Sequence, residues 1–240
     1  MGKVGQSKIT KGGVFIVNFD PKLYGRKIGH KLSSNKLNLL KHKLPRLVIE
    51  KKVANEYLVK KIKSKGKKIT LEIGFGSGEN ILHMLDNEKD TFFLGCEPFI
   101  TGVANFLYLL EEKYFNRVNL FCGDFRMLLE LIKEEVFSRI IILFPDPWPK
   151  ARHKKRRIIN KYNLELFSNV LIDRGCIYIA TDIKDYFHEI KTAFENNNKY
   201  KIINDNFLNK PSELSETKYS LKAIKNFRYP YYITAQKTSG

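Results

Sequence analysis

Short apolar runs alternate along the chain with longer segments in which apolar residues recur at helical spacing. The short runs, bounded by turn-forming residues, are typical of buried strands. They predict strands at 69–73, 91–96, 118–121, 139–144 and 175–180, with shorter ones near 200–207 and 227–234. The helical spacing predicts helices over about 78–86, 101–113, 160–171 and 182–194, with one more before the strand at 139–144. This alternation predicts an α/β fold built on a doubly wound, mostly parallel sheet, with ligands at the carboxyl ends of its strands.

The segment before the first strand differs in character from the rest of the chain. Residues 1–45 are rich in Lys, Gly, Ser and Asn and lack a steady apolar period, so we expect a basic, flexible N-terminal arm. Residues 46–63 place apolar side chains at helical spacing and predict a leading amphipathic helix. The sequence contains no internal repeat, and residues 46–240 are predicted to form a single domain.

Composition narrows the class of protein. No apolar run approaches the roughly 20 residues that span a bilayer, and no secretory signal pattern stands at the N-terminus, so a cytoplasmic protein is expected. Cys96, Cys122 and Cys176 stand apart without paired spacing, which predicts reduced core thiols and no metal site. No feature of the sequence indicates an obligate protein partner.

The net charge of +18 is concentrated in two places. Residues 1–70 carry 19 Lys and Arg against three acids, and seven cations lie between Lys150 and Lys161 with no acid among them. A cationic arm and a cationic loop on an otherwise slightly acidic chain are typical of nucleic-acid binding. An anionic membrane surface is the alternative, but the arm lacks a strong amphipathic pattern with aromatic anchors.

Glycines mark the end of the first predicted strand. Gly74, Gly76 and Gly78 alternate where the strand should turn into a helix. They permit a tight turn and the close approach of a ligand to backbone N–H groups. A dinucleotide fingerprint would require a glycine at position 79, where this chain has Glu79. The G-x-G-x-G spacing therefore favours a ligand without phosphate, such as S-adenosylmethionine.

Each of the first three predicted strands also ends near a carboxylate. Glu72 precedes the glycine loop and could meet the cationic amino-acid end of such a cofactor. Glu97 ends the second strand, where a carboxylate can accept from both ribose hydroxyls. Asp124 ends the third strand, where it could accept from the adenine amine. Any one of these acids could instead be a helix N-cap or a solvated loop residue. Their recurrence at three successive strand ends predicts the nucleotide site of a methyltransferase.

A proline-rich run, Phe144–Lys150, directly follows the fourth predicted strand. Its alternate prolines cannot donate to a β ladder, so the strand must stop and a stiff loop must begin. This loop would hold Asp146 and Trp148 in fixed directions beside the basic run that continues through Arg156 and Arg157. A solvated basic helix after a proline-terminated strand is the alternative, but it requires neither the acid nor the indole.

With these residues, the chain resembles the bacterial tRNA (guanine-N7)-methyltransferases from about Leu23 to the C-terminus. The motifs that carry the resemblance are Tyr24-Gly25-Arg26, Pro45-Arg46, the glycine loop, Glu97, Asp124, Phe144–Lys150 and Arg156-Arg157. The resemblance implies a Rossmann-like class I methyltransferase fold with S-adenosylmethionine as methyl donor. It implies as acceptor N7 of the guanine at position 46, in the tRNA variable loop, which becomes 7-methylguanosine.

The resemblance also implies roles for individual residues. The carboxylates that would line the cofactor site are Glu72, Glu97, Asp124 and Asp146. The residues that would face the substrate are Lys150, Asp182, Thr217, Lys218, Tyr219 and Ser220. The family usually reads Thr-Lys-Phe-Glu in that last segment, so Ser220 replaces an acid and its role is open. Asp182 reads equally well as a helix N-cap.

The chemistry of this reaction fits the residues. Guanine N7 carries a lone pair and no proton, so attack on a sulfonium methyl group needs no obligatory base. Asp146 is the candidate catalytic residue, because a fixed carboxylate would stabilise the positive charge that develops on the purine. Trp148 or Phe99 could stack on the base, although Trp148 fits almost as well as a rim residue packed over the loop. The cations expected to bind flanking phosphates are Lys150, Arg152, Lys154, Arg156 and Arg157.

Two other functions fit parts of this pattern. Methyltransferases that act on an exocyclic amine usually carry D/N-P-P-aromatic at this strand end, whereas Asp146-Pro147-Trp148 lacks the second proline. A non-catalytic RNA-binding protein could share the fold, but every acid and glycine that a cofactor needs is present here.

Overall fold

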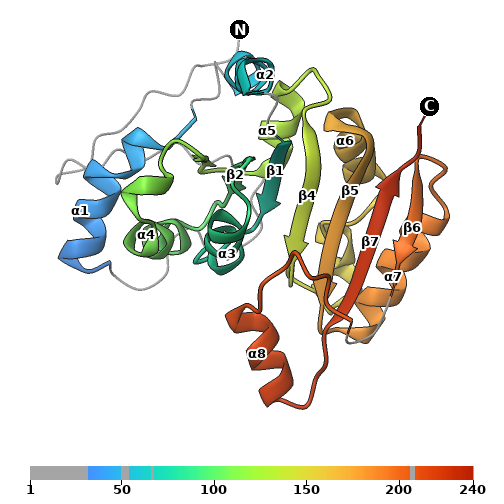
Figure 1. Ribbon diagram of the computed structural model, residues 1–240. Helices are drawn as coiled ribbons and strands as arrows, with labels where there is room; N and C mark the ends of the chain where they lie inside the picture. Colours follow the sequence, from blue (N-terminus) through green and yellow to red (C-terminus); the bar gives the residue numbers. More distant parts are fainter. Residues whose placement is uncertain (1–31, 50–53, 66–67, 206–208, 240) are drawn as a thin grey trace, which may run out of the picture.

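Residues 32–49, 54–65, 68–205 and 209–239 are described by the computed structural model. In this part of the chain, seven strands form one sheet in the order β3-β2-β1-β4-β5-β7-β6 (Figure 1). Only β7 runs against the others, because it is antiparallel to both β5 and β6. The strands are β1 (Lys68–Ile73), β2 (Thr91–Cys96), β3 (Val118–Phe121), β4 (Phe137–Leu143), β5 (Leu171–Thr181), β6 (Tyr200–Asn204) and β7 (Tyr231–Lys237).

Helices cover both faces of this sheet. They are α1 (Ser34–His42), α2 (Ala54–Lys65), α3 (Glu79–Asn87), α4 (Ile100–Leu109), α5 (Phe125–Leu131), α6 (Lys161–Val170), α7 (Lys184–Glu195) and α8 (Lys218–Lys225). Within the described ranges, no helix combines the length and the apolar character needed to cross a bilayer.

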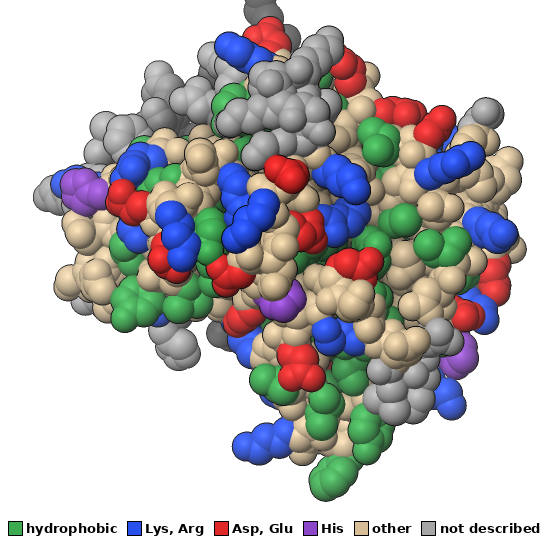
Figure 2. All heavy atoms as spheres, viewed as in Figure 1, with side chains coloured by type: hydrophobic (Ala, Val, Ile, Leu, Met, Phe, Trp, Pro, Cys, Tyr) green, Lys and Arg blue, Asp and Glu red, His purple; other side chains and the backbone are tan. Residues whose placement is uncertain are grey.

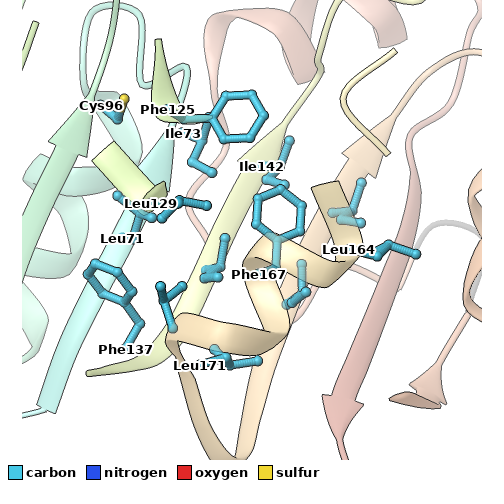
Figure 3. Close-up of a cluster of buried hydrophobic side chains, with 14 of the residues drawn as sticks. Leu71, Ile73, Cys96, Phe125, Leu129, Phe137, Ile142, Leu164, Phe167 and Leu171 are labelled. Carbon is cyan, nitrogen blue, oxygen red and sulfur yellow. The ribbon is translucent and has the colours of Figure 1, made fainter. Parts of the chain in front are cut away.

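Successive residues of the central strands supply two separate hydrophobic layers. In β4, Ile140 and Ile142 join the layer formed with α2, α5, α6 and α7, part of which is drawn in Figure 3. Ile141 points to the opposite layer, formed with α1, α3 and α4. This explains why the strands read as continuous apolar runs: both faces of a parallel sheet are buried. The predicted doubly wound, mostly parallel sheet is confirmed.

The prediction of a helix over 46–63 is wrong in its first half. Residues Leu44–Arg46 form a 3-10 helix, and α2 begins only at Ala54. Between them, Val48 forms a bridge to Leu120 of β3, with Ile49 N donating to the Leu120 carbonyl at 2.8 Å. The exposed edge of β3 offers backbone partners to this apolar segment, and pairing with them replaces helix formation.

The proposed arm is more structured at its C-terminal end than the sequence indicated. Helix α1 lies inside 1–45, with Ser33 as its N-cap, and it packs its buried Leu40 into the layer that includes α4. Residues 1–31, which include Tyr24-Gly25-Arg26, lie outside the described residues.

Helix α8 was not predicted. It occupies Lys218–Lys225, just before β7, and only two of its residues are buried, Ser220 and Ala223. The large apolar side chains of this helix are exposed, so they do not form the core-facing stripe by which a buried helix is predicted.

Candidate active site

Three glycines shape the loop after β1. Gly74, Gly76 and Gly78 have φ values of 75°, 57° and 77°, a left-handed backbone that residues with a β-carbon rarely adopt. Gly78 is also the N-cap of α3, and a β-carbon there would lie 2.1 Å from Cδ2 of Phe106 in α4. Any other residue at position 78 would therefore have to displace the Phe106 ring.

The first turn of α4 approaches the same loop. A β-carbon on Gly102 would lie 2.8 Å from the carbonyl oxygen of Gly76. Sequence reasoning missed Gly102, although a glycine inside a predicted helix is a known sign of close packing. The glycine loop is thus held in place by α4 as well as by β1.

Glu97 joins the glycine loop to the end of β2. Gly76 N donates to Oε2 at 2.9 Å, and Phe99 N donates to Oε1 at 2.8 Å. Burial raises the pKa of Glu97, and these two backbone hydrogen bonds oppose the rise. Glu97 therefore lies beside the glycine loop, where the sequence placed it. Its contact with a cofactor stays a prediction.

Asp124 is buried at the end of β3 and is hydrogen-bonded to the first turn of α5, the helix that follows it. It is the N-cap of α5, where Oδ1 accepts from Arg126 N at 2.8 Å. The guanidinium of Arg126 also donates to both carboxylate oxygens, at 3.2 and 2.9 Å. The capping alternative for Asp124 is therefore correct, and Arg126 is a site residue that sequence reasoning missed.

A cavity of about 370 Å³ lies at this edge of the sheet. The ends of β1, β2 and β3 contribute to its lining Gly74, Gly76, Glu97, Phe99, Asp124 and Arg126. The loop after β4 and helix α8 contribute Phe144, Asp146, Trp148, Arg156 and Tyr219. Glu97 and Asp124, predicted for the cofactor, thus share one space with Asp146, predicted for the base.

The proline loop leaves the sheet abruptly after Phe144, whose N–H donates to the Ala180 carbonyl at 2.8 Å. Phe144 and Trp148 both have left-handed backbones, with φ of 51° and 40°. Such strain in residues with side chains concentrates at functional sites. Asp146 lies between them, with its side chain at the cavity and partly exposed, and partial burial raises its pKa.

Trp148 contacts two side chains of the 3-10 helix that follows the proline loop. The guanidinium carbon of Arg156 lies over its ring, 4.9 Å from the centroid, and His153 meets the ring edge-on at 5.8 Å. Arg156 therefore stands beside the indole in the cavity lining. Trp148 therefore packs beside the loop and also lines the cavity, and its stacking on a base stays a prediction.

Arg157 does not belong to the exposed cations. Its side chain is 1% exposed, with Nη1 paired to Glu189 and Nη2 to Asp185 at 3.1 Å. Its Nε donates to the Pro147 carbonyl at 2.7 Å, and its guanidinium lies over the Tyr186 ring. The prediction that Arg157 contacts phosphate is wrong. Arg157 directly follows Arg156 in the basic run, but its side chain fastens the proline loop to α7.

Glu72 does not line the cavity. It is buried, and its Oε2 accepts from Asn80 Nδ2 at 2.8 Å. Asn80, also buried, accepts from Ser215 N at 3.0 Å. Desolvation raises the pKa of Glu72 to about 8; the Asn80 hydrogen bond lowers it, and the carboxylates of Glu79 and Glu97 raise it further. Instead of reaching toward a cofactor, Glu72 connects β1 through Asn80, which sequence reasoning missed, to the segment before α8.

The segment 217–220 forms the start of α8. Thr217 and Ser220 make a capping box: Ser220 N donates to the Thr217 hydroxyl at 3.2 Å, and Thr217 N donates to Ser220 Oγ at 2.9 Å. A glutamate at the third helical position fills the same role in other capping boxes. The serine at 220 therefore substitutes for the missing acid as a helix cap, and it is buried away from the cavity.

The two residues between these caps face the glycine loop. Lys218 Nζ donates to Ser77 Oγ at 2.6 Å. Tyr219 lines the cavity and stacks on Phe144 with ring centroids 6.4 Å apart. Tyr219 is thus the member of this segment that faces the predicted base site.

The last two predicted substrate residues lie outside the cavity lining. Lys150 is exposed at the start of the 3-10 helix Ala151–Arg156. Asp182 pairs with Arg228 Nε at 3.2 Å. It is not the N-cap of α7, because that position is Ile183. Contact of Lys150 or Asp182 with a substrate stays a prediction.

The sheet order, the glycine loop and the acids at the strand ends define a Rossmann-like class I methyltransferase fold. Residues 66–231 match a family described as a putative methyltransferase. Two solved structures share the fold. One is a 30S ribosomal A1408 methyltransferase from an uncultured bacterium, with TM-score 0.52 and 18% identity over 79% of this chain and 95% of that one. The other is the 16S rRNA methyltransferase KamB, with TM-score 0.55 and 12% identity over 75% and 93%.

The names of relatives similar in sequence are more specific than the family description. A tRNA (guanine-N(7)-)-methyltransferase of Ruegeria sp. (strain TM1040) is 32% identical over 89% of this chain and 87% of its own length. Its counterpart in Bartonella henselae is 36% identical over 88% and 93%. The chain belongs to the tRNA (guanine-N7)-methyltransferase family. A bifunctional methyltransferase of Rickettsia felis is 37% identical over 97% of this chain, which spans only 44% of that longer relative.

Proposed function

We propose that this protein transfers a methyl group from S-adenosylmethionine to N7 of the guanine at position 46 in the tRNA variable loop. The observation that carries the proposal is the single cavity in which Glu97 and the glycine loop meet Asp146, Trp148 and Tyr219. A methyl donor and an acceptor base must share such a space for direct transfer. The names of the relatives from Ruegeria and Bartonella support the choice of base and of RNA.

The residues at the ends of β1 to β3 fit the proposed cofactor. A cavity of about 370 Å³ falls within the roughly 300–1,000 Å³ of small-molecule sites. Each carboxylate oxygen of Glu97 accepts one backbone N–H and has a second lone pair for a ribose hydroxyl. Oδ2 of Asp124 accepts from Arg126 and likewise has a lone pair left for an amine. Bound here, S-adenosylmethionine would supply an electrophilic methyl group on sulfur.

Asp146 would act on the base. Its carboxylate lies on the cavity, and the prolines on either side fix its backbone. Attack by N7 moves positive charge onto the purine, and a carboxylate held beside the ring stabilises that charge as it develops. Tyr219, Phe99 and Trp148 add aromatic surface to the same cavity, against which a base could stack.

Cations outside the cavity would hold the RNA backbone. Lys150, Arg152 and Lys155 are exposed around the 3-10 helix Ala151–Arg156. Lys154 is partly committed to Asp185 and Glu189, at 3.2 and 3.4 Å. We therefore assign phosphate contacts chiefly to the three exposed cations, with Arg156 acting at the cavity.

Methyl transfer and RNA binding separate under one substitution. Asp146→Asn keeps the shape of the side chain and removes its charge, so tRNA binding should persist while transfer from labelled S-adenosylmethionine falls at least 100-fold, a loss of about 3 kcal/mol of transition-state stabilisation. Asp173→Asn, an exposed carboxylate of β5, is the matched control and should retain full activity. Full methylation by the Asp146 variant would contradict the role given to this residue.

A further inference from the structure

Large apolar side chains gather on the outer side of α8 and on the turn that follows it. Of twelve exposed large hydrophobic side chains in the described residues, five lie between 219 and 229. Leu221, Ile224 and Phe227 are 53%, 44% and 89% exposed. Figure 2 shows apolar side chains collected over α8 at the lower end of the molecule. Clustered exposure of this kind marks an interaction site, whereas scattered apolar residues do not.

The attachment of α8 leaves this side open. The helix packs on the protein through small residues, Ser220 and Ala223. At its start, Lys218 is hydrogen-bonded to Ser77. Beyond its end, Arg228 pairs with Asp182. Polar contacts at both ends thus fix α8 in place while its apolar side faces outward.

Phe227 occupies a position that normally suits glycine. The chain leaves α8 through a Schellman turn, in which Arg228 N donates to the Ala223 carbonyl at 2.9 Å and Phe227 N to the Ile224 carbonyl at 3.0 Å. The residue at the left-handed position of this turn is usually glycine, but here it is Phe227, with φ of 55°. The backbone of Phe227 is strained and its ring is exposed to water, so burial of the ring does not stabilise the fold. Backbone outliers of this kind point to function.

The charge of residues 217–229 indicates which kind of partner this surface would bind. Residues 217–229 contain Lys218, Lys222, Lys225 and Arg228 and no acid. Protein–protein interface cores are depleted in lysine, so a second copy of the chain fits this surface poorly. Cations interleaved with exposed aromatic and aliphatic side chains suit single-stranded nucleic acid, whose bases stack while its phosphates are neutralised.

We propose that the α8 surface, formed by Leu221, Lys222, Ile224, Lys225 and Phe227, binds the RNA strand next to the target nucleotide, with Phe227 stacking on a base. Tyr219, at the start of the same helix, lines the cavity, and eight residues of helix span about 12 Å. A strand whose target base entered the cavity would therefore pass along this helix. The inference rests on the proposed function, because it takes RNA as the substrate.

Phe227→Gly tests the stacking directly. Glycine relieves the left-handed strain, so the variant should melt at the same or a higher temperature than the wild type. Binding of an unmodified full-length tRNA transcript, measured by fluorescence anisotropy without cofactor, should weaken roughly 5- to 150-fold, the range for loss of one base–aromatic stack. Phe227→Tyr keeps an aromatic face and should retain binding. Ile203→Ala, which removes a half-exposed apolar side chain of β6, is the matched control and should bind as the wild type does.

Substitution of the two lysines tests the same surface independently, through the salt dependence of tRNA affinity. Lys222→Gln and Lys225→Gln should each reduce the slope of log affinity against log salt by roughly 0.7 if each contacts one phosphate. Lys201→Gln on β6 should leave the slope unchanged.

Two outcomes would overturn this inference while sparing the proposed function. The first is wild-type tRNA affinity in Phe227→Gly, together with normal methylation. The second is a change in sedimentation from dimer to monomer in that variant with tRNA affinity unchanged, which would assign the surface to a second copy. If the wild type neither bound nor methylated tRNA, the proposed function itself would fail.

Discussion

Replacing Glu72 with glutamine removes the charge of one buried side chain and keeps its shape. The wild-type carboxyl is buried in β1 and has Asn80 as a hydrogen-bond donor. Burial raises its pKa from 4.5 to about 8, so the folded protein resists ionisation of this group while the unfolded chain ionises it freely. The neutral Glu72 carboxyl therefore makes its full contribution to the unfolding free energy below about pH 4.5, and this contribution is lost as the pH rises toward about 8.

The magnitude follows from that interval. Each pH unit between the unfolded and folded pKa values is worth about 1.4 kcal/mol, so the whole interval amounts to about 5 kcal/mol. Glu72→Gln has no such titration. The unfolding free energy of the wild type should therefore fall relative to that of Glu72→Gln across this range and then stay level above pH 8.

Urea unfolding of the two proteins, followed by circular dichroism at intervals from pH 5 to 9, measures this difference. Subtracting one protein from the other cancels the titrating groups that do not interact with Glu72. Glu134→Gln, which neutralises an exposed carboxylate between α5 and β4, controls for the loss of one charge and should show no comparable trend. A difference between wild type and Glu72→Gln that stays constant from pH 5 to 8 would refute the account of Glu72.

Three further substitutions test separate parts of the site. Arg157→Ala should lower the unfolding free energy by about 2 kcal/mol in urea titrations, because it removes a buried charged hydrogen bond to the Pro147 carbonyl and the packing of the guanidinium on Tyr186. Arg152→Ala should instead weaken tRNA binding with no loss of stability, and the opposite pattern would restore Arg157 as an RNA contact. Ser220→Ala should cost about 1 kcal/mol through the lost cap of α8, and Ser220→Glu should recover it; equal stability of all three would remove the capping role. Gly78→Ala should lower the unfolding free energy by more than the roughly 1 kcal/mol of backbone strain, since its β-carbon would meet Phe106. A β-carbon on Gly74 has no protein atom within 4 Å, so Gly74→Ala should cost only that strain in urea unfolding; similar losses of stability in both would contradict the packing explanation.

The sheet and the glycine loop could be predicted because their signals are local. A strand buried on both faces is a continuous apolar run, and a left-handed turn requires glycine, so β1 to β5 and positions 74, 76 and 78 follow from short stretches of sequence. Asp124 and Glu97 could be placed for the same reason: parallel strands bring their carboxyl ends to one edge.

The features that sequence reasoning missed depend on contacts between distant segments. Arg156 and Arg157 are neighbours with the same side chain, yet only the approach of α7 decides that Arg157 is buried. The link from Glu72 through Asn80 joins β1 to Ser215, 135 residues beyond Asn80. Such long-range polar contacts leave no periodic pattern in the sequence, and α8 escaped notice because its exposed side, not its buried one, carries the large apolar residues.

The activity proposed for this protein is the formation of 7-methylguanosine in tRNA. The most direct test incubates bulk tRNA with the protein and labelled S-adenosylmethionine, followed by borohydride reduction and aniline cleavage, which cuts the RNA at 7-methylguanosine. We expect label in tRNA and scission at the variable-loop guanine. Label at another base with no scission there, or tight tRNA binding with no label at all, would contradict it.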